Sequence, residues 1–194
     1  MHSSYLTHNY VAVFKAMISA YQPINCVELG VLEGYSALAI ASGLKENFDK
    51  HGAKGHLVAY DLFEEYPYRH VSYETTKKNI DDAGLSDWVT LYQEDAFRAH
   101  SFHGPNTVHF LHVDLSNTGD TVKKIMEFWD NLMVQGGIIC FEGGSEERDQ
   151  IEWMTQYKAE PIKKELETNS IIEARYVFAT YFKFPSLTCL LKKR

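Results

Sequence analysis

Acidic side chains stand at the ends of five apolar segments of this 194-residue chain. A carboxylate offers two acceptor oxygens, so it can bind adjacent hydroxyls or an amino group, or take a proton from a reacting hydroxyl. One such acid is common in a surface loop, but its recurrence after all five segments indicates a shared polar site. The five acids are Glu28, Asp61, Asp95, Asp114 and Glu142.

The first of these acids belongs to a pattern typical of a strand, a tight turn and a helix start. Glu28 is followed by Gly30 and Gly34, and a helical run begins at Tyr35. Glycine lets a ligand lie against bare backbone, and a helix amino terminus offers it unpaired N–H groups. A carboxylate here would repel phosphate, so the pattern favours a ligand with positive charge. The dinucleotide fingerprint is incomplete, because Leu32 stands at its middle glycine.

This pattern resembles motif I of class I S-adenosylmethionine-dependent methyltransferases, which reads acid-x-Gly-x-x-x-Gly. Residues 27–143 resemble O-methyltransferases of the macrocin and catechol type, through Asp114 followed by a helix and through the segment from Trp129 to Gly143. The resemblance implies a Rossmann-like fold and S-adenosylmethionine as cofactor. It also implies methyl transfer to a small molecule, at a hydroxyl oxygen.

The resemblance further implies roles for individual residues. Asp61 would take the ribose hydroxyls, Asp95 the adenine amino group, and Asp114 would lie next to the reacting methyl. Phe63 or Phe97 would pack on the adenine face. The full set of expected cofactor contacts is Glu28, Gly30, Gly34, Ser36, Asp61, Phe63, Asp95, Ala96, Phe97 and Asp114.

An acceptor hydroxyl must lose its proton to a general base or be activated by a metal. The candidate catalytic bases are Asp114 and His112, although His112 fits a packed core histidine as well. The resemblance leaves magnesium open. Asp114 matches one ligand position of catechol-type enzymes, but Glu142-Gly143 replaces their Asp-Asn pair. The metal ligands, if there is a metal, would be Asp114, Glu142 and Asp120.

Strand and helix patterns alternate along the chain, which predicts an α/β fold with a doubly wound, mostly parallel sheet. Strands are expected at residues 25–29, 56–62, 89–93, 107–113 and 138–141, and helices at 5–21, 35–47, 72–83, 118–132 and 146–157. Two further β runs, at 171–182 and 186–192, have no helix between them and predict a C-terminal antiparallel hairpin. The resemblance implies seven strands in all.

Length and composition predict one methyltransferase-like domain over residues 1–194, with an N-terminal helix in 1–22 and an α/β core in 23–194. The net charge of −7 disfavours nucleic-acid partners. No apolar run approaches the roughly 20 residues that span a bilayer. The three cysteines are interpreted as buried small hydrophobes in a reducing cytoplasm. We therefore expect a cytoplasmic protein with a small-molecule acceptor and no membrane partner, and a homodimer stays open.

Two other functions remain open. An NAD(P)-dependent oxidoreductase would also place an acid after the second strand, but the missing middle glycine counts against it. A non-catalytic S-adenosylmethionine-binding module is consistent with the altered segments after the fourth and fifth strands. These segments read Asp114-Leu115-Ser116 and Glu142-Gly143. Turnover of bound cofactor with an acceptor would separate an enzyme from such a module.

Overall fold

The computed structural model describes residues 3–68 and 70–194, so Met1, His2 and Arg69 lie outside the description. The chain divides into two compact units, residues 1–99 and residues 100–194. Each unit has its own strands and helices and is described by itself. The prediction of one domain over the whole chain stays a prediction.

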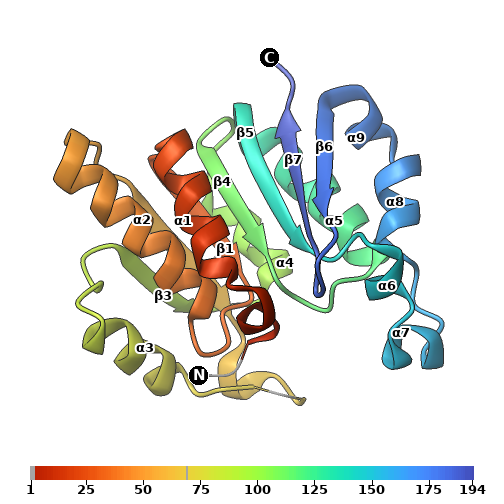
Figure 1. The fold of residues 1–194 in the computed structure, drawn as a ribbon, viewed down its shortest axis with the longest axis horizontal. Coiled ribbons are helices and arrows are strands. Elements are labelled where there is room, and N and C mark those ends of the chain that lie inside the picture. The colour runs from red at the N-terminus through yellow and green to blue at the C-terminus, as the bar shows by residue number, and fades with distance from the viewer. Residues whose placement is uncertain (1–2, 69) are drawn as a thin grey trace. The chain divides into compact units, whose positions relative to one another are not determined.

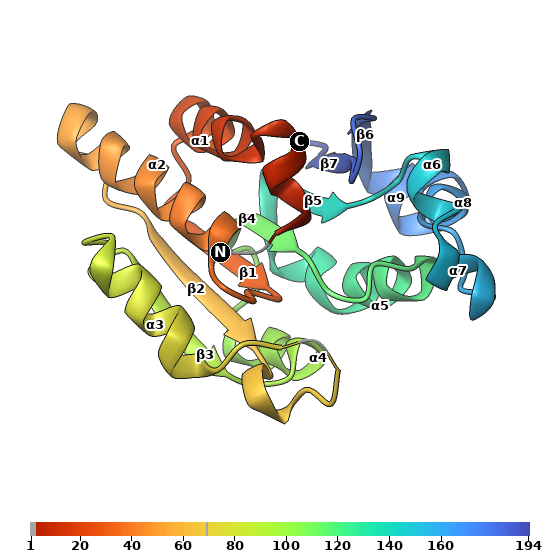
Figure 2. The same ribbon diagram turned by 60° about the horizontal axis from the view of Figure 1, so that its bottom comes forward.

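The first unit contains three parallel strands in the order β3-β2-β1. Helices connect successive strands, as parallel pairing requires. Helices α1 and α2 lie side by side in both ribbon views (Figure 1 and Figure 2). The elements are η1 (Ser4–His8), α1 (Tyr10–Tyr21), β1 (Asn25–Leu29), α2 (Tyr35–His51), β2 (His56–Asp61), η2 (Phe63–Glu65), α3 (Tyr73–Asp82), β3 (Val89–Gln93) and α4 (Ala96–Ala99).

The second unit contains four strands in the order β4-β5-β7-β6. β4 and β5 are parallel, whereas β7 is antiparallel to both β5 and β6. Helices α5 and α8 lie next to each other (Figure 2). The elements are η3 (His100–Phe102), β4 (Val108–Val113), α5 (Gly119–Trp129), η4 (Asp130–Leu132), β5 (Met133–Glu142), α6 (Glu146–Asp149), α7 (Glu152–Gln156), α8 (Ile162–Thr168), α9 (Ser170–Arg175), β6 (Tyr176–Tyr181) and β7 (Leu187–Lys192).

The predicted fold class is confirmed: the described residues form seven strands, mostly parallel, with an antiparallel hairpin at the C-terminus. The apolar runs explain this arrangement, because strands covered by helices on both faces need apolar side chains on both sides. In β4, for example, five of the six residues from Val108 to Val113 are buried. No helix among residues 3–68 and 70–194 is both long and apolar enough to cross a membrane.

Two helices predicted as continuous are interrupted. In the segment 5–21, Asn9 adopts a left-handed φ of 53° that ends η1 before α1 begins. Asparagine tolerates this conformation better than most residues, so it separates the two helices at low cost. The segment 146–157 likewise forms α6 and α7, because Ile151 is extended (ψ 154°) and begins a new helix.

The β run predicted at 171–182 is wrong in its first part, which forms α9. The Asn169 side chain accepts hydrogen bonds from the N–H groups of Ile171 and Ile172, at 2.9 and 3.2 Å. This N-cap stabilises a helix over residues whose β-branched side chains suggested a strand.

Helix α8 was not predicted. Its first N–H groups bond to Asp149, thirteen and fourteen residues earlier in the chain.

The fifth strand is longer than predicted, and it includes Gly136 and Gly137. β5 begins at Met133, and Gly136 within it adopts a φ of 76°. The pairing register with β4 shifts between Val108 and Phe110. A positive φ in a strand bends the backbone, and glycine permits it without a Cβ clash.

Two of the three cysteines meet across strands in the second unit. Cys140 on β5 pairs with Cys189 on β7, and their Sγ atoms are 3.3 Å apart as free thiols. Burial raises the pKa of the Cys140 thiol well above its usual value. Cys26 and Cys140 are buried as predicted, whereas Cys189 is only partly buried.

The chain leaves β5 through two glycines with φ angles of 112° at Gly143 and 100° at Gly144. A Cβ on Gly144 would lie 2.1 Å from Thr188 Oγ1, and one on Gly143 would lie 2.5 Å from Ile162 Cδ1. The Thr188 hydroxyl in turn donates a hydrogen bond to the Gly143 carbonyl, at 2.8 Å. Only glycine therefore allows this turn to pack against β7 and α8.

We expect Gly144→Ala to lower the free energy of unfolding by about 3 kcal/mol, because backbone strain and overpacking act together. Gly136→Ala is the matched control: its φ is also positive, at 76°, but nothing lies within 4 Å of a new Cβ. That variant should carry the strain cost alone, about 1 kcal/mol. Urea unfolding of both variants measures the difference, and equal losses would contradict the packing argument.

Candidate functional site

In the first unit, the predicted acids come together at one edge of the sheet. Glu28 is the second-last residue of β1, Asp61 is the last of β2, and Asp95 follows the end of β3. The three strands are parallel, so their carboxyl ends share this edge. Ligands of open α/β sheets bind outside this edge.

Several of the expected cofactor contacts have little exposed surface. The Glu28 side chain is completely buried, Ser36 in the first turn of α2 is 4% exposed, and Ala96 at the start of α4 is 6% exposed. A buried carboxylate is costly unless positive charge or hydrogen bonds compensate it. Glu28 therefore places a buried carboxyl group next to the glycine turn, where a positively charged ligand would stabilise its ionised form.

The glycine turn between β1 and α2 has three residues with positive φ. They are Gly30 at 85°, Leu32 at 51° and Gly34 at 88°. The Gly34 N–H bonds to the Val31 carbonyl at 2.9 Å and closes the turn. Leu32, at the position of the absent middle glycine, adopts the left-handed conformation that glycine usually supplies. For a leucine this strain persists only where the surroundings hold it.

Asp61 is the main group that holds this turn. Its Oδ2 accepts hydrogen bonds from the Val31 and Leu32 N–H groups, at 2.6 and 3.0 Å, and its Oδ1 accepts one from Phe63 N–H, at 2.8 Å. Three of about four acceptor positions on the carboxylate are therefore used by the backbone. The expected role of Asp61 toward ribose stays a prediction, and its role in shaping the turn was not foreseen.

Helix α3 holds the other side of the same turn. The buried Thr76 hydroxyl donates to the Leu32 carbonyl, and Asn79 Nδ2 donates to the Glu33 carbonyl at 3.0 Å. Thr76 and Asn79 are three residues apart, so they share one face of the helix. Sequence reasoning missed both residues, because their partners lie 44 and 46 positions away.

The two aromatic residues expected to stack on adenine differ in exposure. Phe63 is fully buried and meets the Tyr73 ring edge-on, with centroids 5.3 Å apart. Phe97 is only partly buried, and its N–H bonds to Asp95 Oδ1 at 2.9 Å. Of the two, Phe97 keeps surface that a ligand could contact. Asp95 also orients the start of α4 through this hydrogen bond.

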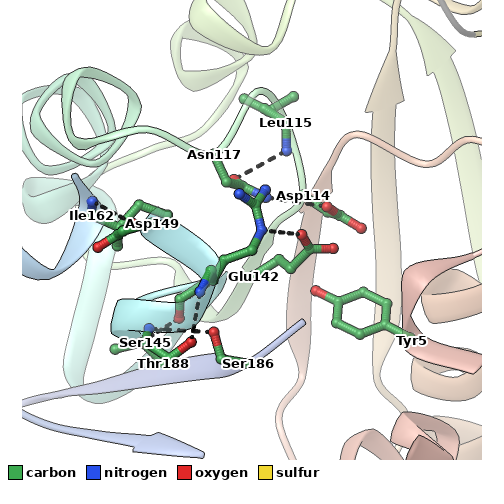
Figure 3. Close-up of polar contacts among 12 residues, drawn as sticks. Tyr5, Asp114, Leu115, Asn117, Glu142, Ser145, Asp149, Ile162, Ser186 and Thr188 are labelled. Atoms are coloured by element: carbon green, nitrogen blue, oxygen red, sulfur yellow. Dashed lines mark hydrogen bonds and ion pairs between the residues drawn. The ribbon is translucent and has the colours of Figure 1, made fainter. Parts of the chain in front are cut away.

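In the second unit, Asp114 and Glu142 extend from the ends of β4 and β5 (Figure 3). The strands are parallel and pair Val113 with Phe141, so the two acids follow paired positions. Asp114 Oδ1 accepts a hydrogen bond from Asn117 Nδ2, at 3.2 Å. Asp114 is partly exposed, as a residue that touches a substrate must be.

His112, the other candidate base, is completely buried within β4 and pairs with Cys140. This burial favours the packed-core interpretation and leaves Asp114 as the more accessible base.

In the first unit, burial raises the pKa of the Tyr60 hydroxyl to about 12. Tyr60 therefore stays protonated near neutral pH, and its ring stacks on Tyr92 with centroids 5.5 Å apart.

Sequence reasoning missed Arg148, which forms an ion pair with Glu142. The Arg148 Nε atom donates to Glu142 Oε1 at 3.1 Å, and the two side chains are only 7% and 8% exposed. Ser145 caps α6 by accepting the Arg148 N–H at 3.2 Å. The Trp153 ring lies 5.4 Å from the guanidinium carbon. The only local signal was an arginine six residues after the strand-end acid.

The side chains in this unit do not fit the magnesium site that the resemblance left open. Glu142 binds a guanidinium rather than offering both oxygens to a cation. Asp120 lies exposed in the first turn of α5. Among the residues described, no group of three or more His, Cys, Asp or Glu side chains is arranged to hold a metal ion.

Comparison with known families identifies the class of protein. A sequence model of the family described as "Methyltransferase domain" matches residues 27–142, more than half of the chain. The chain therefore belongs to this methyltransferase family. The match begins just before Glu28 and ends at Glu142, so it covers all five strand-end acids.

Solved structures show the same fold at low sequence identity. An S-adenosylhomocysteine-bound methyltransferase from Podospora anserina is 17% identical, with a TM-score of 0.70 over 100% of this chain and 80% of that one. The O-methyltransferase TomG from Streptomyces achromogenes, in complex with S-adenosylmethionine, is 14% identical, with a TM-score of 0.70 over 96% and 80%. A Geobacter sulfurreducens methyltransferase is 13% identical, with a TM-score of 0.66 over 96% and 79%. No curated protein matches the sequence.

Proposed function

We propose that this protein is an S-adenosylmethionine-dependent O-methyltransferase that acts on a hydroxyl group of a small molecule. The observation that carries the proposal is the glycine turn at residues 30–34, shaped by Asp61 and backed by the buried Glu28. When bound, S-adenosylmethionine supplies a methyl group on a positively charged sulfur. Methyltransferase neighbours that hold this cofactor or its product support the assignment.

The first unit contains residues suited to bind the cofactor. Glu28 and the glycine turn suit its positively charged methionine end, since a buried carboxylate is stabilised by nearby positive charge. Oδ1 of Asp61 has one backbone partner and retains acceptor capacity for a hydroxyl. Asp95 and Phe97 are the residues that we assign to adenine.

The second unit contains the residues that we assign to the acceptor. Asp114 is partly exposed at the end of β4 and can take a proton from a hydroxyl. Its hydrogen bond from Asn117 fixes the carboxylate orientation. The net charge of −7 favours a small molecule over nucleic acid.

Calorimetric titration of the purified protein with S-adenosylmethionine, S-adenosylhomocysteine and NADH tests the proposal. We expect the two sulfur compounds to bind with micromolar affinity and NADH not to bind. The affinities should be the same with magnesium and with EDTA. Preference for NADH, or no binding of either sulfur compound, would overturn the proposed function. Only the assignment of the fold would then remain.

A further inference from the structure

The Arg148 guanidinium has a buried nitrogen that the protein does not use. Its Nε bonds to Glu142, but Nη1 is buried and has no hydrogen-bond partner among the residues that the structure describes. An unsatisfied buried donor is costly, and more so on a charged group. Such a nitrogen indicates that a ligand oxygen or an ordered water completes the site.

The surroundings hold this guanidinium in a fixed place. Ser145 caps the short helix that carries Arg148, and the turn at Gly143 and Gly144 brings that helix back beside the end of β5. Glu142 binds one side of the guanidinium, and Trp153 lies over it. Asp114 and Glu142 directly follow the paired residues Val113 and Phe141, so the arginine that binds Glu142 is held beside the strand end that carries Asp114.

Resting on the proposed function, we propose that Arg148 Nη1 binds the oxygen of the acceptor hydroxyl and that Asp114 takes the proton of that hydroxyl. The acceptor is then a phenol or an equally acidic hydroxyl. In this reaction the oxygen forms a bond to the methyl carbon, and the carbon–sulfur bond breaks. Its electron pair stays on sulfur, and the hydroxyl proton passes to the Asp114 carboxylate. The arginine then stabilises the negative charge that develops on oxygen, a part often taken by a metal.

The size of this effect selects the class of acceptor. A nearby positive charge lowers the pKa of an acidic group by about 1 to 3. That brings a phenol, with a pKa of about 10, within reach of neutral pH. An aliphatic hydroxyl, which titrates near the value for water of about 15.7, stays far out of reach.

The test uses para-nitrophenol, whose colour reports the ionisation of its hydroxyl, bound to the protein that is saturated with S-adenosylhomocysteine. We expect its pKa in the complex to be lower than in water by about 1 to 3. Glu142→Gln should lower this pKa further, because the arginine loses its counter-charge. The double variant Arg148→Met/Glu142→Gln should return it to the value in water. Arg175→Met, which removes an exposed arginine of the same unit, should match the unaltered protein.

Calorimetry with S-adenosylhomocysteine shows first that each variant is folded and binds the cofactor product. If the unaltered protein fails to bind it, the proposed function falls. If it binds but para-nitrophenol does not bind, or binds with an unchanged pKa, only the inference about Arg148 is overturned. The inference is also overturned if the pKa of bound para-nitrophenol is the same in Glu142→Gln and in the double variant. That result would indicate that the Arg148–Glu142 pair has only a structural role and that water binds Nη1.

Discussion

Asp61→Asn is expected to weaken S-adenosylhomocysteine binding by about 100-fold, or roughly 2.7 kcal/mol. The Asp61 carboxylate accepts three backbone N–H groups, two from the glycine turn and one from Phe63. An amide has one oxygen and one NH₂, so either orientation places donors against donors. The turn then loses the partner that holds Leu32 at a φ of 51°. A smaller fraction of the protein molecules therefore has the turn in the conformation that binds the ligand, which lowers the apparent affinity.

The same substitution should lower the free energy of unfolding by about 2 to 3 kcal/mol, because at least one partly buried N–H is left unsatisfied. Asp81→Asn is the matched control in the same unit. Its side chain is exposed and bonds only to Lys77 and Ser86 among the contacts described. That variant should change neither calorimetric affinity nor urea unfolding measurably. An Asp61→Asn protein that binds as tightly as the control would show that the turn does not need the carboxylate.

Arg148→Met should lower the free energy of unfolding by about 3 to 5 kcal/mol, because it leaves the buried Glu142 carboxylate without its counter-charge. The double variant Arg148→Met/Glu142→Gln should recover much of this loss, since neither charge then remains buried. Urea unfolding of the single and double variants measures both effects. A double variant less stable than the single one would contradict the ion-pair argument.

Arg175→Met provides the comparison for an exposed ion pair. Arg175 is 53% exposed, and its partner Asp130 also binds Tyr176 and Lys192. Removing it should cost about 1 kcal/mol or less. If Arg148→Met is no more destabilising than Arg175→Met, burial does not strengthen the Glu142 pair.

The strand ends were predictable because their signal is local. An apolar run followed by an acid gives both the strand and the position of the acid, and residues 25–29 and 89–93 form strands with the predicted bounds. Parallel pairing then brings the acids to one edge in each unit. The methyltransferase class followed from the same residues, and the family match over 27–142 confirms it.

The C-terminal part shows where local patterns failed. Ile171 and Ile172 suggested a strand, but the Asn169 side chain caps them into α9. Asp149 likewise caps α8 from a separate helix. Side-chain contacts of this kind override weak local preference, because one cap contributes about as much as several residues of propensity.

The sequence by itself determined the alternating elements, the five strand-end acids and the glycine turn, because each depends on neighbouring residues and their periodicity. Only the tertiary structure decided what those acids bind. Asp61 meets the N–H groups of Val31 and Leu32, about 30 residues earlier, and Glu142 meets Arg148. A hydrogen bond depends on where two groups lie in space, and that position is fixed only when strands, turns and helices pack together.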